Sequence, residues 1–368
     1  MDLPIERAYA DSGWDVERLA VLPENWGDVR ALRLVDGKLT YMAHERRGSD
    51  RFARAYAVYG DCVAGPYKHV EHQAIEEGSM LYLAVDMHGV KGTYCGGTCY
   101  AGAYEPCGEI SMAFDSPLVT AMTPKGNYAL VHGKTIVAHE HRMIWGGMFA
   151  KGKKFYLTGK ANTDDDGGEF QAVWGDDRSI VYEALGRVGV VDGRPTFGAR
   201  RRGFDFDVSG LDEKLTDRGF LACHLADEQV RLLRGRNEGE IVVWKGTKSR
   251  VWDSIQRESL VLHGGTLTYW AVDQLGLEVA VVGAAEHQVP DYVTRHSDRI
   301  ELANGLPLYL GSYRRHRGRE HEAYRLVVVC GKEVFTRHTD AHQLEFVDGK
   351  IRFLSVLDRD IVRLSRKL

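Results

Sequence analysis

Apolar and polar residues alternate in short runs along most of the chain, and two-residue turn signals separate the runs. Around the first turn, Leu32, Leu34, Leu39 and Tyr41 occupy the positions expected for one face of a hairpin. A period of two is typical of half-buried strands, and glycine beside a polar residue is typical of a tight hairpin turn. No stretch has a convincing apolar pattern at helical spacing. The pattern therefore predicts an all-β protein.

The turn signals recur regularly, together with a second signal that lies in phase with them. The turns are Asp36-Gly37, Glu77-Gly78, Asp115-Ser116, Lys151-Gly152, Asp192-Gly193, Asp227-Glu228, Gly264-Gly265, Asn304-Gly305 and Asp348-Gly349. The second signal is an apolar-x-Gly tripeptide that ends at Gly60, Gly96, Gly133, Gly175, Gly210, Gly246, Gly283 and Gly331. A fixed period of this length, with four strands A to D in each unit, is typical of β-propeller blades.

Counting the turns predicts a single-domain propeller of nine four-stranded blades that spans residues 1–368. The ninth unit ends after a strand C at residues 360–364, whereas residues 16–22 form a spare strand before the first unit. We expect this N-terminal strand to complete the last blade, because pairing removes two exposed sheet edges. If unit five, at residues 187–217, is an insertion, the alternative is eight blades.

Two tetrapeptides add a resemblance to this pattern. Val-Trp-Gly-Asp at residues 173–176 and Val-Tyr-Gly-Asp at residues 58–61 resemble the end of strand C in the WD-repeat-like class of β-propellers. The regular Gly-His and Trp-Asp pairs of that class are absent. The resemblance covers nearly the whole chain as a pattern, and it implies the architecture without assigning any functional residue.

Composition narrows the environment and the partner classes. The formal net charge of −4 excludes a globally basic nucleic-acid binder. The first residues show no secretory signal, and no apolar segment is long enough to span a bilayer. We therefore expect a cytoplasmic monomer whose six cysteines are reduced and packed. The alternative for Cys95 and Cys99, which flank a predicted C–D turn, is a disulfide or metal site.

Arginines gather in the predicted B–C loops. Strand order places the A–B and C–D turns on one face of the ring, which we call the A–B face. The B–C and D–A connections lie on the opposite face, which we call the B–C face. The arginines that we expect to bind a partner are Arg46, Arg47, Arg200, Arg201, Arg202, Arg234, Arg236, Arg314, Arg315, Arg317 and Arg319. Arginine suits carboxylate and phosphate recognition, so an acidic protein or peptide, or a nucleic acid, would fit this face. The alternative is a solvated loop face.

Two other features of the B–C face carry possible chemistry. Asn162, Asp164 and Asp166, followed by Gly167, match the first half of a calcium loop, although an acidic solvated loop is the alternative. Histidines gather in the D–A connections, and the pentapeptide at residues 294–298 nearly repeats at residues 336–340. For these histidines we expect a hydrogen-bond network within a blade, with a metal site as the alternative.

The motifs of common enzyme classes do not occur. The chain has no Gly-x-Ser-x-Gly elbow, no P-loop and no dinucleotide fingerprint. The leading hypothesis is a non-enzymatic interaction scaffold that uses the B–C face. The alternatives are a binder of nucleic acid or another polyanion through the arginines, and a hydrolase or lyase at the mouth of the central channel.

Overall fold

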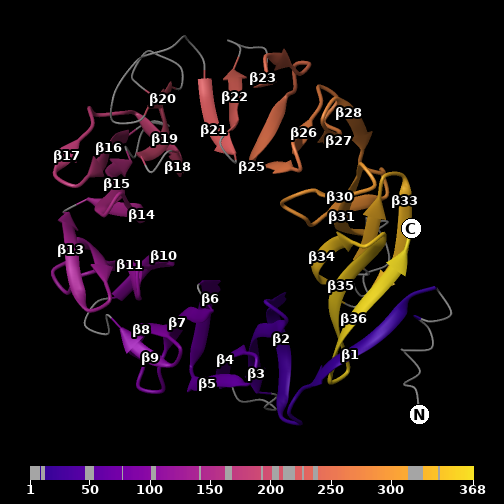
Figure 1. The fold of residues 1–368 in the computed structure, drawn as a ribbon, viewed down its shortest axis with the longest axis horizontal. Coiled ribbons are helices and arrows are strands. Elements are labelled where there is room, and N and C mark those ends of the chain that lie inside the picture. Colours follow the sequence, from indigo (N-terminus) through magenta and orange to yellow (C-terminus); the bar gives the residue numbers. More distant parts are fainter. Residues whose placement is uncertain are drawn as a thin grey trace, which may run out of the picture.

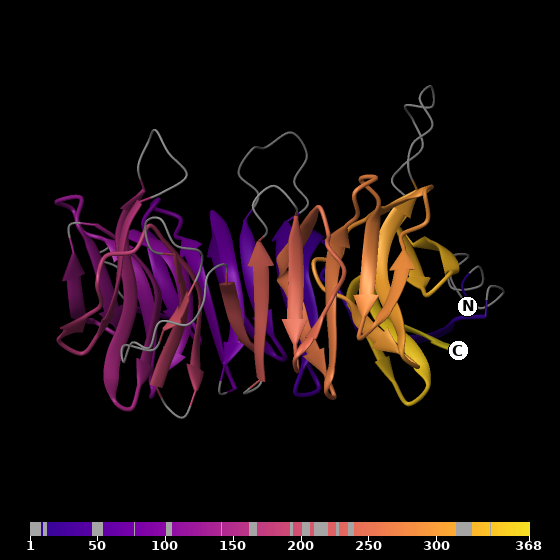
Figure 2. The ribbon, with the colours of Figure 1, turned by 90° about the horizontal axis from the view of Figure 1, so that it is seen from above.

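The described residues form a ring of antiparallel sheets. The structure, a computed structural model, describes residue 9 and residues 13–45, 54–76, 78–100, 105–140, 142–161, 168–191, 194–200, 207–209, 220–225, 228–234, 239–313, 326–338 and 340–368. Every regular element in these ranges is a strand, and the strands form nine separate sheets. The sheets follow one another around a common centre (Figure 1), and their strands run between the two faces of the disc (Figure 2). The chain is therefore an all-β protein of the propeller class.

Six sheets contain four strands that pair in chain order. Their strands are β2 (Trp26–Val35), β3 (Lys38–Glu45), β4 (Ala55–Tyr59), β5 (Cys62–Tyr67); β6 (His69–Glu76), β7 (Ser79–Val85), β8 (Lys91–Cys95), β9 (Thr98–Tyr100); β10 (Glu105–Ala113), β11 (Ser116–Met122), β12 (Tyr128–His132), β13 (Thr135–Glu140); β14 (Met143–Ala150), β15 (Lys153–Ala161), β16 (Gly168–Trp174), β17 (Asp177–Arg178); β21 (Phe220–Leu225), β22 (Glu228–Arg234), β23 (Glu240–Trp244), β24 (Thr247–Lys248); and β25 (Ser254–His263), β26 (Thr266–Val272), β27 (Glu278–Val282), β28 (Ala285–Gln288).

The other three sheets depart from this scheme. One has three described strands: β18 (Ala184–Val191), β19 (Arg194–Arg200) and β20 (Asp207–Ser209). Another has a divided first strand: β29 (Val293–Arg295), β30 (Glu301–Ala303), β31 (Leu306–Tyr313), β32 (Leu326–Cys330) and β33 (Glu333–His338). The last joins the two ends of the chain: β1 (Asp15–Val21), β36 (Asp360–Lys367), β35 (Lys350–Leu357) and β34 (His342–Val347).

The N-terminal strand is held by both backbone and side chains. β1 pairs antiparallel with β36, and its closest neighbour in Figure 1 is the C-terminal strand. Beyond β1, Leu22 N donates to Arg359 O at 2.7 Å, and Arg359 Nη2 donates to Leu22 O at 2.8 Å. Before it, buried Trp14 packs edge-on against Phe353, with 5.1 Å between ring centroids. The strand predicted at residues 16–22 is thus present as β1, with its edge paired.

The core consists of apolar layers between neighbouring sheets. An aromatic side chain is buried at the fourth position of strand B in seven sheets: Tyr41, Tyr82, Tyr156, Phe197, Tyr269, Tyr309 and Phe353. Tyr82, for example, stacks on Tyr94 of its own sheet and shares a 2.8 Å hydrogen bond with Tyr67 of the preceding sheet. The Tyr156 hydroxyl likewise donates to Glu140 Oε1 of the preceding sheet at 2.8 Å, so these two tyrosines link adjacent sheets through their polar ends.

The innermost strands contain a feature that the sequence pattern does not predict. Register shifts interrupt strand A in seven sheets, namely in β2, β6, β10, β14, β18, β25 and β34. In an eighth sheet, residues 296–300 separate β29 from β30. Asp28, Ala31 and Gln343 lie within these bulges and adopt positive φ angles of 26°, 52° and 46°. Bulges bend a strand and re-aim its side chains, so the inner edge is irregular in most of the described sheets.

The A–B turns were mostly predicted correctly, with one error of register. Five of the predicted turn pairs, those beginning at Asp36, Lys151, Gly264, Asn304 and Asp348, are turns with positive φ. In unit three the turn is Phe114-Asp115 rather than Asp115-Ser116, because Ala113 pairs with Ser116. This register buries Leu118 and Val119, and burial outweighs the preference of polar residues for the turn.

The outer strand of unit six is short, because β24 ends at Lys248. Ser249 then folds back: its Oγ accepts a hydrogen bond from Val242 N at 3.0 Å. Trp252 resumes pairing as an isolated bridge to Glu240. Ser179 makes the same contact with Ala172 N in the β14–β17 sheet, so a serine replaces part of the ladder in two sheets.

Candidate functional site

The site residues predicted from the sequence lie outside the described part of the chain. Arg200 ends β19 and Arg234 ends β22, but their side chains are not among those described. The remaining predicted residues lie wholly outside the described ranges: Arg46, Arg47, Arg201, Arg202, Arg236, Arg314, Arg315, Arg317, Arg319, Asn162, Asp164 and Asp166. The candidate site is therefore built from described residues on the same B–C face.

Three B–C connections share one compact turn. In the first, Asp86 Oδ1 accepts hydrogen bonds from the backbone N atoms of His88 and Val90, both at 2.8 Å. These bonds, with that from Val90 first, lower the pKa of Asp86. Asp273 caps Leu275 and Leu277 in the same way, and Thr123 Oγ1 accepts from Asn127 N. The signal for this turn, Asp or Thr followed three residues later by Gly, was present in the sequence and was missed.

One of these turns and an exposed aromatic pair lie at the B–C ends of two adjacent sheets. Leu275 is 83% exposed at its turn, while Tyr292 and Tyr313 are 52% and 38% exposed. The two tyrosine rings stack, with centroids 6.0 Å apart and planes at 27°. Pairing of Val293 with Tyr313 in strands β29 and β31 fixes this arrangement. We call Leu275, Tyr292 and Tyr313 the tyrosine patch.

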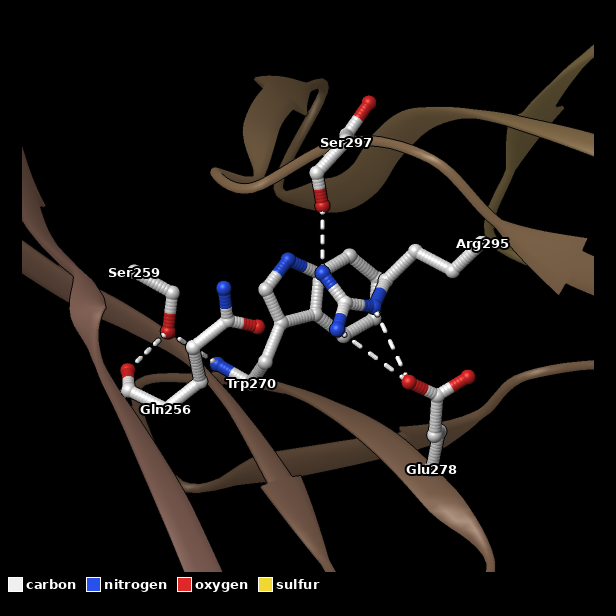
Figure 3. Close-up of polar contacts among 6 residues, drawn as sticks. All are labelled: Gln256, Ser259, Trp270, Glu278, Arg295 and Ser297. Atoms are coloured by element: carbon white, nitrogen blue, oxygen red, sulfur yellow. Dashed lines mark hydrogen bonds and ion pairs between the residues drawn. The ribbon is translucent and has the colours of Figure 1, made fainter.

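A cluster centred on Arg295 lies at the same junction of sheets (Figure 3). The Arg295 guanidinium lies over the Trp270 ring, 4.6 Å from its centroid. Its Nε and Nη2 donate to Glu278 Oε1 at 3.2 and 3.1 Å, and its Nη1 donates to Ser297 O. Glu278 and Trp270 belong to the β25–β28 sheet, whereas Arg295 lies in β29, the first strand segment of the next sheet. The cluster thus joins two sheets by charge, hydrogen bonding and ring stacking.

Trp270 anchors this cluster in the core. Its ring is 2% exposed and meets Tyr309 edge-on at 4.9 Å. Ser259 Oγ accepts from Trp270 N at 2.8 Å, and the amide of Gln256 lies beside the indole (Figure 3). Burial, followed by the charge of Glu278, raises the pKa of Tyr309. The charged groups of the cluster engage one another, so the cluster joins the two sheets without itself offering a free charge.

The described histidines partly match their predicted place. His296 Nε2 is 2.7 Å from Ser312 Oγ, a contact within one sheet, as expected. His69, His139, His338 and His342 lie in strands, however, and not in the D–A connections. The two copies of the pentapeptide are also not equivalent. The copy at residues 294–298 starts within β29, which is part of a strand A, whereas the copy at residues 336–340 starts within β33, which is a strand D. No group of three or more metal-binding side chains occurs within the described ranges.

The described cysteines form no disulfide. Cys62, Cys95, Cys99, Cys107 and Cys330 are free thiols. Thr98, not Cys99, pairs with Cys95 across the hairpin. Burial raises the pKa of the Cys330 thiol to about 11, but Cys62, Cys99 and Cys107 are exposed, so the expectation of packed thiols is wrong for those three. Within the described residues, no helix is long and apolar enough to cross a membrane.

One carboxyl at the inner edge of the ring has a perturbed pKa. Burial raises the pKa of Glu301, nearby His263 lowers it, and Glu345 adds to the increase. A carboxyl group with a raised folded-state pKa stabilises the fold in its protonated form. That contribution is complete below the unfolded pKa, about 4.3, and is lost as the pH rises through the folded pKa.

Glu301→Gln should therefore raise the melting temperature at neutral pH and have little effect below about pH 4. The amide keeps the shape of the protonated acid without a charge that must be desolvated. Thermal unfolding of both proteins across this pH range measures the difference. An equal effect at both ends of the range would contradict a titrating Glu301.

Comparison with known proteins identifies no family. No family model and no curated protein matches the sequence. Similar solved structures include the computationally designed Ika8 protein (10% identity, 94% of this chain and 98% of that one, TM-score 0.39) and the Dos1 propeller (10%, 97% and 96%, 0.35). The propeller domain of the trilobed protease from Pyrococcus furiosus is similar at 9% identity, 81% and 94% coverage, and a TM-score of 0.34. At these values the similarities assign no function.

Proposed function

We propose that the chain is a nine-bladed, WD-repeat-like propeller closed by β1, and that it is a non-enzymatic scaffold whose B–C face binds an acidic segment of a partner protein. The observation that carries this proposal is the tyrosine patch. Tyr292, Tyr313 and Leu275 expose apolar surface on the face to which strand order assigns the arginine-rich loops. In the sequence, Arg314, Arg315, Arg317 and Arg319 directly follow Tyr313.

The chemistry of the patch favours a protein over a nucleic acid. Tyrosine supplies rigid contact area at low entropic cost, and tyrosine and arginine are enriched at protein interfaces. Leu275 offers only aliphatic contact, which suits a side chain better than a phosphate. An acidic protein segment can place apolar side chains on the tyrosines and carboxylates on the arginines.

The test replaces the four arginines after Tyr313 by serine. Arg314→Ser, Arg315→Ser, Arg317→Ser and Arg319→Ser together should weaken binding of a labelled polyglutamate peptide at least about tenfold at low salt. Stability should change by no more than about 0.5 kcal/mol per substitution, since we expect these residues to lie in a B–C loop. Fluorescence anisotropy and thermal unfolding measure the two quantities.

Two controls decide how a loss of binding is interpreted. Charge removal on the A–B face, by Lys248→Ser with Lys332→Ser, should leave binding unchanged; an equal loss would mean diffuse attraction and would contradict the face assignment. A single-stranded oligonucleotide tested in parallel should bind more weakly than the acidic peptide. Tighter binding of the oligonucleotide, with a steep salt dependence, would favour the polyanion alternative instead.

A further inference from the structure

The A–B face carries a strained and exposed phenylalanine. Phe114 lies in the A–B turn of the β10–β13 sheet, with a φ of 58°, and is 62% exposed. The equivalent positive-φ positions of other A–B turns hold Asp36, Lys151, Gly264, Asn304 and Asp348. For a bulky L-residue this conformation is a true outlier, and its exposed ring gains little from burial to offset the strain. An outlier of this kind points to a function for the side chain.

The ring of Phe114 belongs to a fixed aromatic platform. It lies 5.2 Å from the Phe149 ring and 6.1 Å from the His132 ring, and these two rings are 5.3 Å apart. His132 is held in turn, because its Nε2 is 2.8 Å from Ala113 O. Since Phe149 lies in strand β14, one residue before its end, the platform bridges two neighbouring sheets. The platform is Phe114, His132 and Phe149.

Two exposed lysines lie in the turns beside this platform. Lys134 is exposed on the C–D turn of the same sheet, and Lys151 is exposed on the A–B turn that follows Phe149, whereas the Lys153 ammonium lies over the Trp174 ring, 5.4 Å from its centroid. The opposing charge in the turn is Asp115, which also accepts a hydrogen bond from Ser116 Oγ. Asp176 and Asp177 belong to the outer C–D turn of the β14–β17 sheet. Around the exposed ring itself, the lysines favour a partner with carboxylates.

We propose that this platform is a second docking surface, which receives an apolar side chain of an acidic protein segment on Phe114. Aromatic anchors of this kind dominate the energy of many interfaces, while the surrounding charges set partner choice and association rate. The platform lies on the face opposite the tyrosine patch. A partner can therefore occupy each face at the same time, and the propeller bridges the two partners.

The test combines binding with stability. The probe is a labelled acidic peptide in which glutamates alternate with leucine and phenylalanine, and its counterpart has serine at every apolar position. The measurements use a Tyr292→Ala, Tyr313→Ala background, in which the tyrosine patch cannot contribute a preference for apolar side chains. In that background we expect the apolar peptide to bind at least about tenfold more tightly than the serine peptide, and Phe114→Gly to abolish that preference. Glycine adopts positive φ without strain, so the melting temperature of Phe114→Gly should be unchanged or about 2–4 °C higher.

Three controls separate docking from structure. Phe114→Tyr keeps the ring and should keep the preference, as should Leu306→Ala, which removes an exposed apolar side chain elsewhere on the A–B face. Lys134→Glu with Lys151→Glu should reduce binding of both peptides without affecting the fold. The proposal is overturned if the two peptides bind equally, if Phe114→Gly retains the preference, or if that variant melts well below the wild type.

Discussion

Deletion of residues 1–25 should destabilise the protein by more than about 4 kcal/mol or cause it to aggregate. The deletion removes β1 and exposes the backbone donors and acceptors of β36 that β1 now pairs. It also removes Trp14 and Leu22, which are 2% and 1% exposed, and an aromatic or aliphatic side chain lost from a core costs about 2–5 kcal/mol by itself. Urea unfolding and size-exclusion chromatography measure the two outcomes.

Adding the missing strand as a separate peptide tests ring closure directly. A synthetic peptide of residues 1–25 should bind the truncated protein and restore its stability in proportion to concentration. A peptide with Trp14→Ala should restore much less, whereas one with Val21→Ala should act like the original, because Val21 is 58% exposed. A truncated protein that stays monomeric and melts like the full chain would exclude a closing role for β1.

The local parts of the fold were predictable because their signals are local. Asp36-Gly37 and Asn304-Gly305 adopt the positive φ angles that their residue types favour, so the hairpins could be placed from the sequence alone. The bulges of strand A were not predicted, because the alternation of apolar and polar residues identifies strands only as regular elements. The register of unit three was not predicted, because Ala113 pairs with Ser116 and this pairing places Phe114 in a turn that its own preference disfavours.

The contacts that build the candidate site could be predicted only in part. The Asp-x-x-Gly turn that presents Leu275 has a sequence signature and could have been found. The stacking of Tyr292 on Tyr313 depends on the pairing of β29 with β31, and that of Arg295 on Trp270 depends on two sheets meeting at one junction. Such contacts follow from tertiary arrangement, and residue type alone does not specify them.

The pair formed by Arg295 and Glu278 should show strong coupling in a double-mutant cycle. The side chain of Arg295 is 16% exposed and that of Glu278 is 31% exposed, so the loss of either partner leaves a poorly solvated charge. Glu278→Leu alone should cost about 2–4 kcal/mol, because Arg295 then keeps only Ser297 O and the Trp270 ring.

The double variant Glu278→Leu with Arg295→Met should recover at least about half of that loss, since both charges are then replaced by apolar groups of similar length. Urea unfolding midpoints of the four proteins give the coupling. Arg250→Met with Glu286→Leu is a matched control: Arg250 Nε binds Glu286 at 3.0 Å, but both side chains are more than 40% exposed, so its coupling should be below about 1 kcal/mol. If the two cycles give equal coupling, burial does not strengthen the Arg295 pair.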